Sequence, residues 1–199
     1  MKKIFQILLI ILVSQVALAQ NKKGVVYLND GSQLKGLVKL TKGNKVKYRL
    51  NKESEKRIFN KHSVDRVVLF KEDGELEEFA FRQIERSSIS SIKVMQVITR
   101  GKITLYKVVT HGTHYYGGGL PGQAPMMGAS YSISNYYVGK EDSKLVNQIT
   151  SKGALFEKNF KKAAMNYFKD CPALVKLIEN KTYRKRDLEE IVKYYNEKC

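Results

Sequence analysis

The chain has 199 residues, a formal net charge of +17 and a hydrophobic fraction of 43%. That hydrophobic fraction is ordinary for a globular protein and excludes a disordered chain. The length suits one domain, or one domain with a small appendage.

The first nineteen residues have the pattern of a secretory signal peptide. Lys2 and Lys3 give a positive start, residues 4–13 form an apolar run, and residues 17–19 (Ala-Leu-Ala) supply the small-residue cleavage motif. The apolar run is too short to span a bilayer, which needs about 20 apolar residues. We therefore predict cleavage after Ala19 and an exported protein, located in the periplasm or outside the cell.

Residues 24–50 show the alternation of antiparallel strands that have one buried and one wet face. The first strand, 24–28, runs into Asn29-Asp30-Gly31-Ser32, and Asp-Gly is a strong hairpin signal. The apolar positions predicted to face the core in the next two strands are Leu34, Gly36, Val38, Leu40, Val46, Tyr48 and Leu50.

The opposite face of the same two strands carries five cations. They are Lys35, Lys39, Lys45, Lys47 and Arg49. Residues 20–60 hold eleven Lys or Arg against three Asp or Glu, a net charge of +8. Clustered like charges attract polyanions and cost stability unless an anion neutralises them. The five residues are therefore a candidate anion-binding face; the alternative is a solvated surface that keeps the protein soluble.

An exported protein rarely meets nucleic acid, so we expect a different polyanion as partner. The candidates are an acidic glycan, a phosphorylated lipid and an acidic protein, with peripheral association to the cell envelope. The sequence does not indicate an oligomeric state.

Further strands are predicted over residues 66–70, 76–81, 93–99, 103–110, 131–138 and 145–149. Their regular spacing favours an antiparallel sandwich or small barrel. Between two of these strands, residues 112–128 are rich in glycine and proline, which predicts a loop.

Five tyrosines flank the predicted loop: Tyr115, Tyr116, Tyr131, Tyr136 and Tyr137. Tyrosine offers a large contact area at low entropy cost, so these residues are a candidate recognition surface. Strand propensity alone also favours tyrosine, and this alternative stays open.

From residue 152 the apolar period becomes helical. Pro172 suits the first turn of a second helix, and Glu189 and Glu190 lie near the start of a third, where the helix dipole favours acids. We predict three short helices and a disulfide between Cys171 and Cys199. The fold class is α+β: an antiparallel β domain over residues 20–151, then a helical tail over residues 152–199.

Motifs for catalysis are weak. Residues 62–65 (His-Ser-Val-Asp) contain the residue types of a catalytic triad, but triads are assembled from distant segments. On an extended strand, His111 and His114 point to opposite faces, which is wrong for a shared metal. We predict no catalytic residue, metal site or cofactor. The leading hypothesis is a non-enzymatic binding or envelope-associated module; the alternative is a hydrolase acting on envelope or extracellular polymers.

Two segments resemble an uncharacterised family of secreted Bacteroidota proteins. One is the opening 24–36, with Asn29-Asp30-Gly31; the other is the tail, with Asp170-Cys171-Pro172 and the final Cys199. The resemblance covers about a third of the chain. It implies export, a strand-rich N-terminal region and a helical tail with two cysteines. It implies no catalytic residue, because the family has no settled activity.

Overall fold

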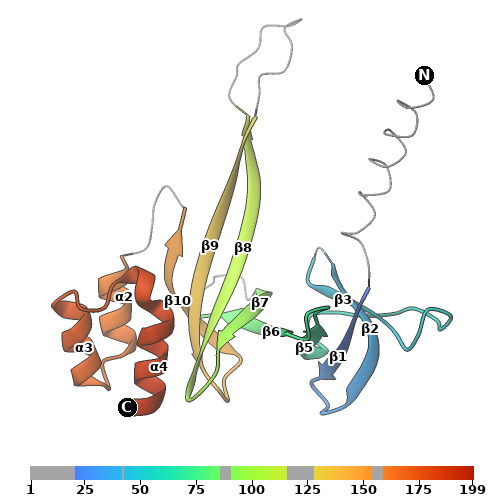
Figure 1. Ribbon diagram of the computed structural model, residues 1–199, viewed down its shortest axis with the longest axis horizontal. Helices are drawn as coiled ribbons and strands as arrows, with labels where there is room; N and C mark the ends of the chain where they lie inside the picture. The colour runs from blue at the N-terminus through green and yellow to red at the C-terminus, as the bar shows by residue number, and fades with distance from the viewer. Residues whose placement is uncertain (1–20, 42, 86–90, 116–127, 154–158) are drawn as a thin grey trace, which may run out of the picture. The chain divides into compact units, whose positions relative to one another are not determined.

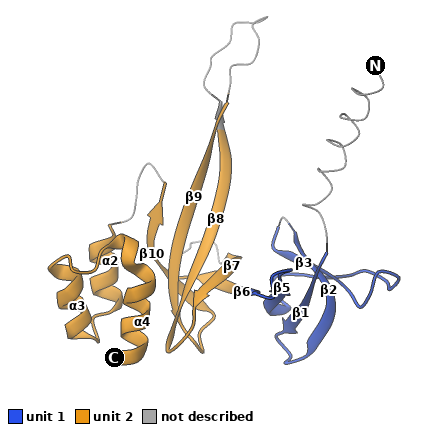
Figure 2. Ribbon diagram, viewed as in Figure 1, with its two compact units in different colours: residues 1–78 blue, residues 79–199 orange. Residues whose placement is uncertain are grey.

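The computed structural model describes residues 21–41, 43–85, 91–115, 128–153 and 159–199 (Figure 1). Its strands and three short C-terminal helices confirm the α+β class, mostly β. The chain divides into two compact units, residues 1–78 and residues 79–199 (Figure 2). This division falls inside the region assigned to one β domain, and the domain limits 20–151 and 152–199 stay predictions.

The strands of unit 1 are β1 (Lys22–Leu28), β2 (Gln33–Thr41), β3 (Lys45–Arg49), β4 (Arg57–Phe59) and β5 (Val64–Phe70). They pair antiparallel in the order β5-β1-β2-β3-β4. Strand β6 (Leu76–Ile84) follows β5 in the sheet order and continues into unit 2. The hairpin predicted at Asn29–Ser32 is confirmed, with Gly31 at φ 86° and the Asp30 carboxylate accepting hydrogen bonds from Ser32.

Alternate apolar residues form the core of unit 1. Val26, Val38 and Val46 are almost fully buried, and the register places them on one face with Tyr48 and Val67. This is the predicted buried face of the hairpin strands, because side chains two apart on a strand point to the same side.

Leu50 was predicted to belong to this buried face, and that prediction is wrong. Strand β3 ends at Arg49, and Leu50 lies in the following bend with 65% of its surface exposed. The alternation therefore stops one residue earlier than the sequence pattern indicates.

The strands of unit 2 are the end of β6, β7 (Ile92–Thr99), β8 (Ile103–Tyr115), β9 (Gly128–Lys140) and β10 (Leu145–Lys152). They pair in chain order, and β10 then pairs in parallel with β6, where Leu145 lies opposite Gln83 and Val146 opposite Ile84. Five strands thus close into a ring, the small-barrel form of the predicted β region. The parallel contact between β10 and β6 is the exception to the predicted antiparallel pairing.

The two faces of β8 and β9 belong to different cores. Tyr106 and Tyr137 lie opposite each other and are buried with Ala80, Met95 and Val146 inside the ring. Their neighbours point the other way. The outward-facing core, shared with the helices, contains Ile103, Leu105, Val138, Ile149, Ala164, Phe168, Leu174, Ile178, Ile191 and Val192.

The helices are α2 (Phe160–Tyr167), α3 (Pro172–Glu179) and α4 (Leu188–Lys198), and they confirm the predicted three-helix tail. Asn159 caps α2 through its side chain, and Pro172 begins α3. Residues 154–158, near the start of the predicted helical tail, lie outside the described residues. Among the described residues, no helix has the length and apolar character needed to cross a membrane.

Asn196 anchors α4 to the turn between β7 and β8. Its Nδ2 donates to the Ile103 carbonyl (3.0 Å), and its Oδ1 accepts from the Ile103 N–H (2.9 Å). Gly101 makes this approach possible, because a Cβ there would lie 2.3 Å from Asn196 Nδ2. One side chain therefore satisfies both backbone groups of a core residue.

The loop predicted over residues 112–128 is shorter than expected. Strand β8 continues to Tyr115 and β9 begins at Gly128, so Gly112–Tyr115 are strand residues and that part of the prediction is wrong. Gly112 fits the strand because the Tyr131 ring lies across it; a Cβ at Gly112 would be 2.3 Å from Tyr131 Cζ. Residues 116–127 lie outside the described residues.

The structure confirms the disulfide between Cys171 and Cys199, whose Cα atoms are 5.7 Å apart. Cys171 immediately precedes α3 and Cys199 ends α4. The bond therefore ties the chain end to the junction between the helices.

We expect Cys199→Ser to lower the free energy of unfolding by about 2–4 kcal/mol, because the unfolded chain loses a cross-link that closes a long loop. Chemical unfolding of the variant and of the wild type, monitored by circular dichroism, measures this loss. Reducing the wild type should give the same loss. Two reactive thiols in unreduced native protein would contradict the assignment.

Candidate functional site

The basic sheet face of unit 1 is made by the five predicted cations of β2 and β3: Lys35, Lys39, Lys45, Lys47 and Arg49. The register places Lys39 opposite Lys47, Leu37 opposite Arg49 and Thr41 opposite Lys45. Directly opposite residues of antiparallel strands point to the same side of the sheet, as do residues two apart on one strand. The structure therefore brings all five cations to one face.

Positive charge on this face is only partly compensated. Lys35, Lys45 and Lys47 form no ion pair with any carboxylate in the part of the chain that the structure describes. The Arg49 guanidinium donates to the backbone carbonyl of Lys52 (3.1 Å). Lys39 and Lys47 lie directly opposite each other, an arrangement in which like charges repel.

Carboxylates of unit 1 neutralise cations on other strands. Glu77 pairs with Lys22 (3.8 Å), and Glu78 pairs with Arg66 (3.6 Å), whose guanidinium lies 4.0 Å from the centre of the Tyr27 ring. These pairs involve β1, β5 and β6. Five cations of unit 1 lie together on β2 and β3, and together they make the potential over that face positive.

Lys23 is a sixth cation of this face that the sequence analysis missed. It lies on β1 opposite Leu37, which is itself opposite Arg49. The alternation of side chains along β1 indicates that Lys23 faces away from the core. Only the pairing of β1 with β2 shows that Lys23 lies on the same face as the five predicted cations.

The three candidate tyrosines whose side chains the structure describes do not share one surface. Tyr137 is 4% exposed inside the ring, whereas Tyr136 packs against the helical core and lies 5.9 Å from Lys107 Nζ. Tyr131 covers Gly112 on the extended hairpin. Tyr115 ends β8, and Tyr116 lies outside the described residues. The structure thus separates Tyr131, Tyr136 and Tyr137, which sequence proximity grouped.

The histidines offer no shared metal site in the described part of the chain. His62 and His111 are exposed, and no group of three or more His, Cys, Asp or Glu residues could hold a metal among the described residues. For His114 the structure describes only the strand backbone, at the end of β8.

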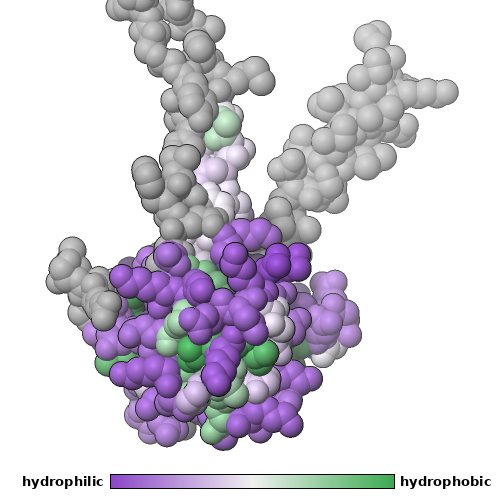
Figure 3. All heavy atoms as spheres, turned by 90° about the vertical axis from the view of Figure 1, so that its left-hand side faces the viewer, coloured by the Kyte–Doolittle hydropathy of each residue, from purple (hydrophilic) through white to green (hydrophobic). Residues whose placement is uncertain are grey.

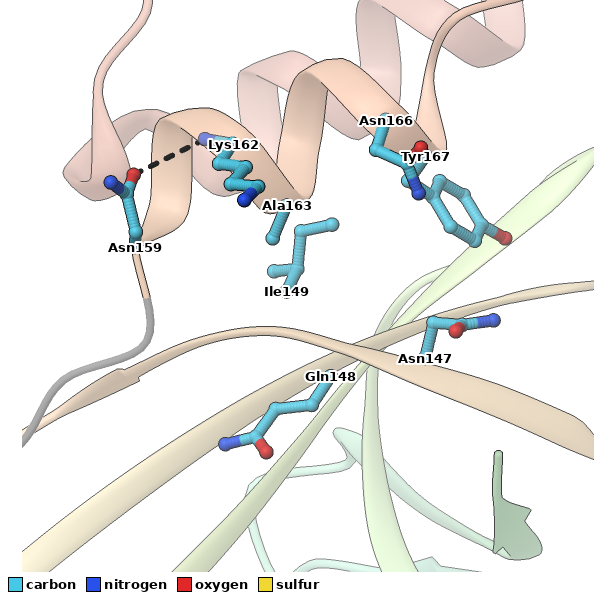
Figure 4. A pocket seen from close by; sticks show the side chains of 8 residues that line it. All are labelled: Asn147, Gln148, Ile149, Asn159, Lys162, Ala163, Asn166 and Tyr167. Atoms are coloured by element: carbon cyan, nitrogen blue, oxygen red, sulfur yellow. Dashed lines mark hydrogen bonds between the residues drawn. The ribbon is translucent and has the colours of Figure 1, made fainter. Parts of the chain in front are cut away.

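A polar cavity of about 490 Å³ lies between β10 and α2 (Figure 4). The helix contributes one face, at positions i, i+3, i+4, i+7 and i+8 from Asn159 to Tyr167. Asn147 and Ile149 lie on the strand side, and the Gln148 side chain points away from the helix and donates to Asn135. This is the normal alternation of side chains along a strand; the register of β10 with β9 shifts just beyond, between Gln148 and Thr150.

A second cavity, of about 260 Å³, shares Asn147 and Tyr167 with the first. Two carboxylates line it, Glu85 and Asp170. Asn147 donates a hydrogen bond to Glu85, and the Tyr195 hydroxyl donates to Asp170 (2.6 Å). These two acids are 85 positions apart in the sequence and meet only through folding.

Two phenols of this cavity hold their protons strongly. The hydrogen bond to Asp170, with burial and the carboxylate charge, raises the pKa of Tyr195 to about 12. Burial, followed by the neighbouring Tyr195 and Asp170, raises the pKa of Tyr167 to about 12. Both phenols therefore remain donors at neutral pH.

The side of the molecule that carries the helices is mostly hydrophilic, with small hydrophobic patches between polar residues (Figure 3).

Comparison of the chain with protein-family models, with curated proteins and with solved structures gives no match. Function must therefore be argued from the surfaces of this chain.

Tyr195→Phe should reduce the loss of stability between pH 10 and pH 12. The pKa of this phenol is about 12 in the folded protein and 10.0 ordinarily, so its contribution is present below pH 10 and is lost as the pH rises through 12. The melting temperature, measured across this pH range, should fall less steeply in the variant than in the wild type.

Asp170→Asn should give a similar reduction, because it removes the charge that favours the protonated phenol. Unchanged pH dependence in both variants would contradict the role of the Tyr195–Asp170 contact.

Proposed function

We propose that this protein is an exported, non-enzymatic binding module that holds an acidic polysaccharide on its basic sheet face. The observation that carries the proposal is the β2–β3 register, which places Lys39 opposite Lys47 and puts five cations on one face. A bound polyanion would offset this repulsion, and the attraction would weaken with salt.

The geometry of the face favours an extended ligand. Same-face residues on a strand are about 6.7 Å apart, and directly opposite residues are about 5 Å apart. From Lys45 to Lys35 the cations therefore follow a strip about 20 Å long. A chain that bears negative groups at intervals can contact several of these cations at once, whereas a single small anion cannot.

An acidic glycan fits this strip better than a lipid surface. Membrane binding commonly adds inserted apolar side chains to cationic contacts. Leu37, which lies between the cations of β2, is half-buried, and Ile58, opposite Lys47, adds a single exposed apolar side chain rather than an apolar patch. Export is supported by the signal-peptide pattern of residues 1–19 and by the disulfide, which is typical of oxidising compartments.

Replacing Lys35, Lys45 and Lys47 by Gln together should weaken binding to polygalacturonate about tenfold or more at low salt, since exposed charge pairs contribute up to about 1 kcal/mol each. Calorimetric titration measures the affinity. The melting temperature should be unchanged or raised, because the substitutions relieve repulsion.

The matched control is K169Q/K176Q/K198Q, which removes the same charge from exposed positions in unit 2. It should bind polygalacturonate nearly as well as wild type. Equal weakening of binding in both triple variants would mean that binding depends on the net charge of the protein and not on the basic sheet face. Binding only to phosphatidylglycerol vesicles, and not to polygalacturonate, would mean that the ligand is a lipid surface and not a glycan.

The second cavity supports a second candidate, hydrolysis of an acidic polymer. Glu85 and Asp170 provide two carboxylates in one cavity, the minimum set for glycosidic acid–base chemistry. Wild type should then shorten polygalacturonate on prolonged incubation, as size-exclusion chromatography would show. E85Q should bind the polymer but leave its length unchanged. An unchanged polymer with wild type would exclude this activity on that substrate.

A further inference from the structure

A long segment of this highly charged protein has no charged residue. Charged residues make up 28% of the chain, yet none of the 32 residues from Val108 to Gly139 is Asp, Glu, Lys or Arg. The segment comprises most of β8 and β9, which form the extended hairpin of unit 2 (Figure 1). This concentration of neutral residues requires a reason other than average composition.

One backbone edge of this hairpin is open. Strand β8 pairs with β7 only through residues Leu105–Lys107, while β9 covers its other edge along the whole strand. From Val108 to Tyr115, β8 has no recorded pairing with a described strand along the first edge. Alternate residues direct their N–H and C=O groups to each side, so about four residues present both groups to this edge.

The open edge lacks the features that normally prevent strand pairing. Natural edge strands carry charged residues, proline or bulges that block association. Residues 108–115 contain no proline and no charged residue, and the register with β9 is regular along this stretch. Val109 is 40% exposed, and His111 and Thr113 are exposed. The Tyr131 ring lies across Gly112 on the paired strand β9.

We propose that the Val108–Tyr115 edge pairs antiparallel with the same edge of a second copy of this chain. Such pairing is isologous, so one edge supplies both halves of the interface. Two copies of this strongly basic chain repel each other, whereas residues 108–139 carry no like charge that would oppose their approach. The proposal is independent of polysaccharide binding and gives the dimer two basic sheet faces.

Symmetry limits which side chains meet across the dimer. Directly opposite residues point to the same face of a sheet, so a two-fold axis through that sheet pairs odd-numbered residues with odd-numbered ones. Val109, His111 and Thr113 would therefore face one another in several registers. Lysine at all three positions would place like charges opposite one another in each of these registers.

The test compares V109K/H111K/T113K with V109Q/H111Q/T113Q by sedimentation velocity of the full mature chain. The lysine variant should be monomeric, whereas wild type and the glutamine variant should dimerise with increasing concentration. Circular dichroism and melting temperature should show that both variants fold. Wild type that stays monomeric at all concentrations, or a lysine variant that still dimerises, would overturn the proposal.

Hydrogen exchange provides the second measurement. Amides of residues 108–115 that face the open edge should become protected as wild type dimerises, and should stay unprotected in the lysine variant. Equal protection in dilute monomer would mean that the chain itself covers this edge, and would also overturn the proposal.

Discussion

The fold of unit 2 depends on the alternation of side chains along β8 and β9. The start of β8 and the end of β9 are buried on both faces. Leu105 and Val138 contribute to the core beneath the helices, whereas Tyr106 and Tyr137 fill the ring. A shift of one residue would exchange the two sets and put large tyrosines against the helices. The bonds from Asn196 to the Ile103 backbone fix α4 against this register, so pairing of the strands and docking of the helix stabilise each other.

This constraint ends where the hairpin leaves both cores, and the candidate surfaces lie in such places. Beyond Lys107, no pairing of β8 with β7 is recorded, and Val109, His111 and Thr113 are exposed. In unit 1, Val38 and Tyr48 occupy the core side, so the opposite side of the same strands can carry Lys39 and Lys47. Positions that packing does not restrict are therefore available for binding.

Local sequence signals predicted much of this arrangement. The Asp30-Gly31 turn, the Pro172 helix start and the alternation of β2 and β3 each depend on neighbouring residues, and the structure confirms them. Non-local features were not predictable. Closure of β10 on β6, the place of Lys23 beside Leu37 and the cavity that joins Glu85 to Asp170 depend on which distant segments meet. The three-residue strand β4 is too short to show a period.

The two proposed surfaces differ in their response to salt, because opposite electrostatic forces act on them. Attraction between the basic sheet face and a polyanion is screened as ionic strength rises, so that binding weakens. Pairing of two copies through the charge-free hairpin is opposed by the repulsion between their net charges, and screening reduces this opposition. Salt therefore favours the dimer while it disfavours the bound polysaccharide, and a bound polyanion, by neutralising the cations, should itself favour dimerisation.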